Sequence, residues 1–175
     1  MVNSILHTDA LEQKYGPITA IVVRHDPAGK TTGERMRKAK LVDQCGIVRT
    51  YALTFLKEYP ESKELDEIEG KIQKGALIGQ TFRNYHYDIT RIELGSFDIP
   101  ITDWLKNEFQ TSSSVAHATV IDFHVEKTGK GSFTYGTLIE VYCPEFYPPS
   151  GLVEKSDDLK PLYRRLIAQL DPVVI

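Results

Sequence analysis

The alternation of apolar and polar side chains along the chain predicts a set of β-strands. The clearest is the segment 47–56, IVRTYALTFL, in which most alternate side chains are apolar or aromatic. Residues 115–125 alternate in the same way, and the EKTGKG turn at 126–131 joins them in a hairpin to a further strand at 132–143. Extended structure is also predicted for residues 18–24, 35–42 and 87–94.

The segment 35–42, RMRKAKLV, carries four basic residues within eight positions. A strand at the edge of a sheet keeps lysines and arginines in water, and charged side chains there discourage unwanted pairing. We therefore predict an edge strand with solvated basic side chains. Its free edge leaves two oligomeric states open, a monomer or a homodimer that pairs through this strand.

Helical signals separate the predicted strands. A helix over residues 9–15 follows the N-cap Thr8 and stops at Gly16. The charged segment 60–74, PESKELDEIEGKIQK, predicts a surface helix capped by Ser62, with acidic residues first and lysines later, as the helix dipole favours. The remaining helical segments are a short one within residues 75–91, one at 102–109 and one at 157–170.

Strands joined by hairpins, with helices between them, predict an α+β fold: an antiparallel sheet with helices packed on it. A chain of 175 residues with 41% hydrophobic content is long enough for one globular core. We therefore expect a single domain over residues 1–175.

Composition narrows the classes of function. The net charge of −3 arises from 21 basic and 24 acidic residues without long runs, which argues against nucleic-acid and membrane-surface binding. No apolar segment has the length of a signal peptide or a membrane span, so a cytoplasmic protein is expected. Cys45 and Cys143 lack metal-ligand spacing and are expected as free thiols, although a disulfide between them stays open.

The stretch from Gly75 to Arg91, GALIGQTFRNYHYDITR, is the first candidate site. Gly75 and Gly79 bracket an apolar turn and permit a close approach of the backbone. Arg83 and Arg91 follow among aromatic and apolar residues. Backbone amides with guanidinium groups nearby predict an anion site.

Arg49 is the second candidate, because alternation places it on the apolar face of the strand 47–56. A cation among core-facing side chains is costly unless it is paired. Three interpretations remain open: Arg49 lies at the rim of the apolar face, pairs with a carboxylate of the protein, or lines a cavity that receives an anion.

Three motifs stand in order along the chain: VRTYALTF, GALIGQTFRNYHYDITR and LIEVYCPEF. This ordered set, within Gly29 to Phe146, resembles the chorismate lyase (chorismate–pyruvate lyase) superfamily, and GKTTGERM stands where that family has an early threonine turn. The resemblance implies an antiparallel sheet with an enclosed ligand cavity. It also implies a carbon–oxygen lyase that needs no cofactor or metal and eliminates pyruvate from chorismate to give 4-hydroxybenzoate.

The resemblance assigns roles by position. Arg49 is expected to bind the ring carboxylate, assisted by the backbone amides of Ile78 and Gly79, and Arg91 is expected as a further arginine of the pocket. Glu140 is expected to contact the ring hydroxyl, and with Arg49 it is the expected catalytic residue. It would act near the hydroxyl or ether oxygen if burial raises its pKa.

Thr32 of the GKTTGERM turn is a further expected substrate-binding residue. The helix 60–74 and the longer stretch before Glu140, with its Trp104 helix, depart from the family pattern and leave the substrate open. A non-catalytic domain that binds a small carboxylate is the alternative function. A further interpretation involves no functional site: Arg49 and Glu140 form a purely structural ion pair.

Overall fold

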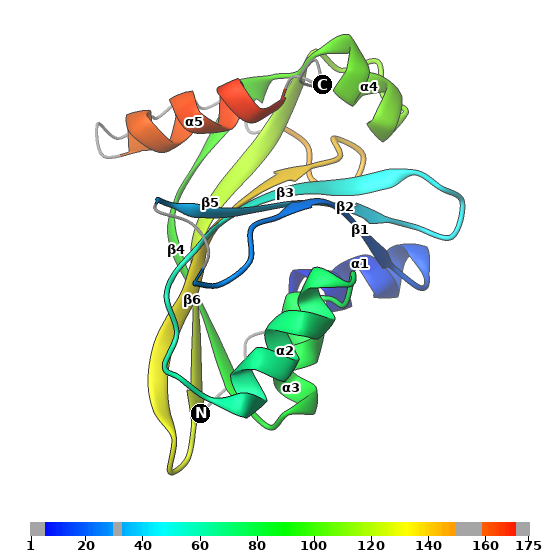
Figure 1. The fold of residues 1–175 in the computed structure, drawn as a ribbon. Coiled ribbons are helices and arrows are strands. Elements are labelled where there is room, and N and C mark those ends of the chain that lie inside the picture. The colour runs from blue at the N-terminus through cyan, green and yellow to red at the C-terminus, as the bar shows by residue number, and fades with distance from the viewer. Residues whose placement is uncertain (1–5, 30–32, 150–158, 171–175) are drawn as a thin grey trace.

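The computed structural model describes residues 6–29, 33–149 and 159–170, and it confirms an α+β fold built on an antiparallel sheet (Figure 1). Six strands pair in the order β1-β2-β3-β6-β5-β4. The strands are β1 (Thr19–His25), β2 (Arg35–Val42), β3 (Val48–Leu56), β4 (Asp88–Pro100), β5 (Val115–Lys127) and β6 (Gly131–Tyr142). The helices are α1 (His7–Tyr15), α2 (Lys63–Gln73), α3 (Ile78–Asn84), α4 (Asp103–Phe109) and α5 (Lys160–Leu170).

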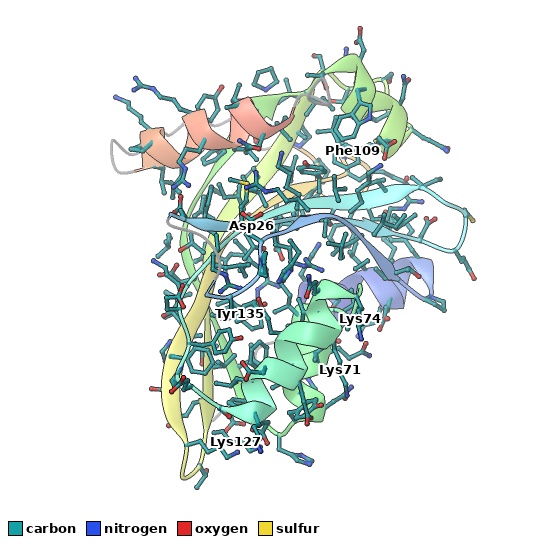
Figure 2. The ribbon with its side chains drawn as sticks, viewed as in Figure 1. Asp26, Lys71, Lys74, Phe109, Lys127 and Tyr135 are labelled. Atoms are coloured by element: carbon teal, nitrogen blue, oxygen red, sulfur yellow. The ribbon has the colours of Figure 1, made fainter. Side chains whose placement is uncertain are left out.

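The sheet is covered on both faces, which divides the core into two layers. Figure 1 shows α4 and α5 over one face, and α1, α2 and α3 over the other. Figure 2 places Phe109 within the first layer and Tyr135 within the second, with Lys71 and Lys74 on the outer side of α2. Because both faces of the sheet are covered, every residue of β3 is buried, including the polar residues Arg49, Thr50 and Thr54.

The prediction for residues 35–42 is correct in its bounds and wrong in its environment. Strand β1 pairs along the outer side of β2, so β2 is an interior strand and has no free edge for a partner. Its arginines lie beneath α2 rather than in water: Arg35 is 2% exposed and Arg37 is 3% exposed. The edges of the sheet are β1 and β4.

Other predictions shift by a few residues. The predicted helix 60–74 is α2, with Ser62 at the N-cap position but without a capping side-chain hydrogen bond. The expectation that its charges are solvated is wrong for Glu69, which is buried. Thr102 does cap α4, since its hydroxyl accepts a 3.3 Å hydrogen bond from the Leu105 amide. Part of the predicted helix 157–170 lies outside the described residues.

Two further observations concern membranes and thiols. None of the helices within the described ranges is long and apolar enough to cross a membrane. Cys45 is exposed and Cys143 is buried, and both are free thiols. The disulfide left open by the sequence is therefore not formed.

Gly136 allows β3 and β6 to lie close together, and its replacement by alanine is expected to destabilise the protein. An added Cβ would lie 2.8 Å from the Phe55 carbonyl oxygen and 2.9 Å from Thr54 Cγ2. Backbone cannot give way as a flexible side chain can, so we expect a loss of about 1–3 kcal/mol in unfolding free energy, measured by urea denaturation. Gly70 of α2 has no atom in that space, and Gly70→Ala is expected to stabilise by about 0.5–1 kcal/mol. Equal stability of the two variants would contradict this account.

Candidate functional site

A cavity lies between the sheet and the first residues of α1 and α3. It has a volume of about 50 Å³, and strands β2, β3, β4, β5 and β6 form its floor. Half of its lining residues are apolar: Leu6, Leu41, Ala52, Leu77, Ile78, Phe123 and Leu138. The rest comes from His7, Thr8, Arg37, Thr54, Gly79, Arg91 and Glu140.

Four of the residues proposed from the sequence meet in this cavity. Ile78 and Gly79 enter from the start of α3, while Arg91 and Glu140 enter from β4 and β6. A Cβ on Gly79 would lie 2.6 Å from the Leu6 side chain, so the glycine permits α1 and α3 to close over the sheet. Thr32 lies outside the described residues.

Arg49 lies elsewhere and is paired. Its Nε donates to Asp43 at 2.8 Å, and its NH1 donates to Glu145 at 2.7 Å. The guanidinium also lies 3.8 Å from the centre of the Tyr15 ring. Burial lowers the pKa of Arg49, but the hydrogen bonds to Asp43 and Glu145 raise it more, to a value above its ordinary one.

A β-bulge explains the position of Arg49. Leu41 pairs with Thr50 and Val42 pairs with Val48, so Arg49 is the extra residue that has no opposite partner. Period-2 alternation therefore does not predict its direction. The ion pair between Arg49 and Glu140 considered from the sequence is not formed, since each residue has other partners.

Glu140 is the centre of a polar group at one end of the cavity. Its Oε2 accepts a 2.5 Å hydrogen bond from Arg91 and a 3.0 Å hydrogen bond from the Tyr142 hydroxyl. Burial raises the pKa of Glu140, but the attraction of His7 and Arg91 and these hydrogen bonds lower it more, so the net pKa is below its ordinary value. Glu140 is thus an ionised carboxylate at neutral pH, not the protonated acid that the sequence led us to consider.

Burial shifts the pKa values of two neighbours of Glu140. Burial is the main cause that lowers the pKa of His7, and its Nε2 lies 2.7 Å from Thr50 Oγ1. Burial and the charge of Glu140 raise the pKa of Tyr142, so its hydroxyl stays protonated and donates. Arg91 forms the ion pair with the carboxylate of Glu140.

The opposite end of the cavity holds a residue that the sequence interpretation missed. Arg37 of β2 lies directly across from Thr54 of β3, and both line the cavity. The buried Nε and NH2 of Arg37 and the buried Oγ1 of Thr54 have no hydrogen-bond partner among the described residues. Burial lowers the pKa of Arg37, although Tyr135 and Glu69 raise it. A guanidinium nevertheless remains charged at any pH a protein tolerates.

One pattern in the sequence could have identified Arg37 as a buried residue. Alternation along β2 places Arg35 and Arg37 on the same face as Ala39 and Leu41, so the arginines share the apolar face of the strand. The number of basic residues led to the edge-strand prediction, and it obscured this pattern.

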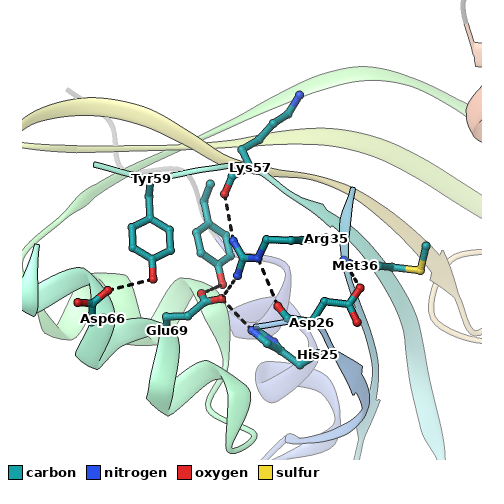
Figure 3. A network of polar contacts seen from close by, with 9 residues as sticks. His25, Asp26, Arg35, Met36, Lys57, Tyr59, Asp66 and Glu69 are labelled. Carbon is teal, nitrogen blue, oxygen red and sulfur yellow. Dashed lines mark hydrogen bonds and ion pairs between the residues drawn. The ribbon is translucent and has the colours of Figure 1, made fainter. Parts of the chain in front are cut away.

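A buried ionic network surrounds Glu69 (Figure 3), and its member Arg35 lies on the same face of β2 as Arg37. Glu69 of α2 accepts hydrogen bonds from Arg35, from His25 at 2.8 Å and from the Tyr135 hydroxyl at 2.7 Å. The remaining donors of Arg35 reach the backbone carbonyl oxygens of Asp26 and Lys57. The carboxylate of Glu69 therefore pairs with its own neighbours, and Arg37 has no carboxylate partner within residues 6–29, 33–149 and 159–170.

This arrangement is suited to binding a carboxylate. An unpaired charge or an unmade hydrogen bond in the interior costs free energy, and an anion at Arg37 would remove that cost. A carboxylate can accept two parallel hydrogen bonds from one guanidinium. Phe123 and Leu138 then offer apolar surface to the organic body of the ligand.

Comparisons with known proteins give no family assignment: no protein-family model matches the chain, and no curated protein matches it. Among the described residues, no group of three or more histidine, cysteine, aspartate or glutamate side chains lies together as metal ligands would. The functional conclusion therefore rests on the chemistry of the cavity.

Proposed function

We propose that this protein is a chorismate lyase-like enzyme that eliminates pyruvate from chorismate to give 4-hydroxybenzoate without a cofactor. The observation that carries the proposal is the buried guanidinium of Arg37, whose Nε and Nη2 have no hydrogen-bond partner in the part of the chain that the structure describes, at a cavity that Arg91 and Glu140 also line. In this proposal the ring carboxylate binds Arg37, which takes the role expected of Arg49. Thr54 is placed to add a hydrogen bond.

Binding of a ring requires the cavity to open. A volume of about 50 Å³ holds a few water molecules, whereas a cavity of about 150 Å³ accommodates benzene. Leu6 and Ile78 cover the cavity from the starts of α1 and α3, above the sheet residues Phe123 and Leu138. We infer that the ligand enters as these two helices move away from the sheet, and that they then enclose it.

The ionised state of Glu140 suits it to act as a base. As the bond from the ring carbon to the enolpyruvyl oxygen breaks, its electron pair leaves with that oxygen. The proton on the neighbouring ring carbon passes to Glu140, and the electrons of that carbon–hydrogen bond complete the aromatic ring. The charge of Arg91 offsets the change in charge at Glu140. The positioning of the substrate and the tendency of its ring to become aromatic supply the acceleration of the reaction.

Glu140→Gln tests this role. We expect kcat to fall about 100- to 1000-fold, because an amide cannot accept the proton, while the affinity for 4-hydroxybenzoate stays within about threefold. Turnover is followed by the absorbance of 4-hydroxybenzoate after chorismate is added, and binding by calorimetry. Glu126→Gln on the exposed end of β5 is the matched control and should leave both quantities unchanged. Unchanged turnover in Glu140→Gln would rule out the chemical role.

A non-catalytic carboxylate-binding domain is the second candidate function. It is favoured by the direct pairing of Glu140 with Arg91 and Tyr142, which gives the carboxylate a structural use. The expected result is then stabilisation without turnover: 4-hydroxybenzoate at 100 times its Kd would stabilise the fold by about 2.7 kcal/mol. Thermal unfolding with and without this ligand, beside the absorbance assay, separates the two functions.

A further inference from the structure

A second cavity adjoins the first on the same face of the sheet. It has a volume of about 280 Å³ and a mostly polar wall, to which Arg91, Ser96, His117, Thr119 and Tyr142 contribute. Arg91 lines both cavities, and the Tyr142 hydroxyl donates to Glu140 in the first.

The strand register shows that the two cavities are neighbours. Thr119 of the second cavity lies directly opposite Glu140 of the first, and Ile121 lies directly opposite Leu138. Directly opposite residues of antiparallel strands have Cβ atoms about 4.5–5.5 Å apart on one face. A ligand that reaches past Glu140 therefore enters the second cavity.

His117 is the residue of this cavity that is best suited to proton transfer. Its Nδ1 lies 2.9 Å from Asp98 Oδ1, and both side chains are buried. Because Asp98 engages Nδ1, Nε2 is the ring nitrogen left for a ligand. The imidazole also stacks on the Tyr147 ring, with 4.8 Å between centroids and 18° between planes.

Charged and aromatic groups from several elements face His117. Asp98 from β4 contacts the imidazole, the aromatic rings of Tyr142 and Tyr147 stack beside it, and Glu93 and Arg91 share the cavity. The contact with Asp98 fixes the orientation of the imidazole in the cavity.

We propose that the second cavity is the leaving-group compartment of the same site, with His117 as a further catalytic residue. The compartment takes a three-carbon acid that bears a carboxylate and an enol or keto oxygen. Arg91 holds the carboxylate, and Asp98 is the positioning residue of His117. This inference rests on the proposed function.

The proton transfers balance. The ring carbon–oxygen bond breaks with its electron pair on the leaving oxygen, which takes the Nε2 proton of the His117 imidazolium and becomes enolpyruvate. Glu140 holds the proton lost from the ring carbon. Enolpyruvate then becomes pyruvate by tautomerisation in water. Glu140 releases its proton to water and His117 takes one proton from water, which returns both residues to their starting states.

His117→Gln tests the inference. We expect kcat to fall at least about 100-fold while the Kd of 4-hydroxybenzoate stays within about twofold, because that product occupies the first cavity only. His124→Gln is the matched control, since His124 lies on the same strand and bonds Thr134 at 3.2 Å. Asp98→Asn is a second variant that keeps a hydrogen-bond acceptor, and it should lower kcat about tenfold or more with an unchanged KM.

Amide chemical shifts give a readout that does not depend on turnover. Pyruvate should move the amide signals of Ser96 and Thr119 in the wild-type protein, and in His117→Gln these shifts should saturate at a higher pyruvate concentration. The product 4-hydroxybenzoate should instead move those of Ile78 and Gly79. Wild-type kcat in His117→Gln, or pyruvate that leaves Ser96 and Thr119 unmoved, would overturn the inference. A wild-type protein that neither binds 4-hydroxybenzoate nor converts chorismate would overturn the proposed function. The pyruvate titration would still decide whether the second cavity binds a three-carbon acid.

Discussion

Arg37→Met is expected to abolish the binding of 4-hydroxybenzoate and, at the same time, to make the protein more stable. The guanidinium is 3% exposed, and its Nε and NH2 have no hydrogen-bond partner among the described residues. A buried, unpaired cation is unfavourable, so an apolar side chain of similar length should raise the unfolding free energy by about 1–3 kcal/mol. Removing the charge also removes the anchor for the carboxylate.

A loss of affinity together with a gain in stability would identify Arg37 as a binding residue. Replacing an arginine that has only a structural role lowers the stability of the protein instead. Calorimetry measures the affinity, and urea denaturation measures the stability. Arg37→Lys keeps the charge but not the planar pair of donors, and it should weaken binding at least about tenfold. Arg83→Met is the matched surface control, since Arg83 is exposed and pairs with Asp9. A destabilised Arg37→Met protein that still binds the ligand would refute the assignment.

Glu69→Gln is expected to lower the unfolding free energy by about 3–5 kcal/mol, the largest loss of stability that we predict. The carboxylate of Glu69 holds Arg35, His25 and the Tyr135 hydroxyl, all of them buried. Without its charge, Arg35 remains an uncompensated cation in the interior, which is the costly way to break a buried ion pair. Glu67→Gln, on an exposed position of the same helix, should change stability by less than about 0.5 kcal/mol.

The same residue predicts a dependence of stability on pH. Burial raises the pKa of Glu69, but hydrogen bonds from His25 and Tyr135 and the attraction of Arg35 lower it more, so the folded-state pKa lies below the ordinary value of 4.5. Protonation therefore favours the unfolded chain, and this stability is present above pH 4.5 and lost as the pH falls through the folded-state pKa. Urea denaturation between pH 3 and pH 7 should show a steeper acid loss in the wild type than in Glu69→Gln. Parallel curves would contradict this assignment.

Local features of the sequence were sufficient to predict the elements. The strand 35–42 and the short helix ended by Phe109 match β2 and α4 closely, because side-chain periodicity and caps act over a few residues. The ordered motifs also selected Ile78, Gly79, Arg91 and Glu140, which the fold brings into one cavity. Their catalytic and binding roles remain proposals.

The local sequence pattern could not predict which arginine lines the cavity. A bulge of one residue turns Arg49 toward Asp43 and Glu145, and such a slip reverses the face that alternation predicts. Arg37 became the buried cation because β1 covers the edge of β2 and α2 covers its face. Both facts depend on contacts between distant segments.

The sequence by itself thus determined the kinds and approximate bounds of the helices and strands, together with the overall α+β class. Tertiary structure alone decided which charged groups are buried, which are paired, and which meet in a common cavity. The physical reason is that alternation and capping are properties of neighbouring residues, whereas burial and pairing depend on sheet order. Glu140 shows the difference: its position on an alternating strand was predictable, but its ionised state depends on Arg91, 49 positions earlier in the chain.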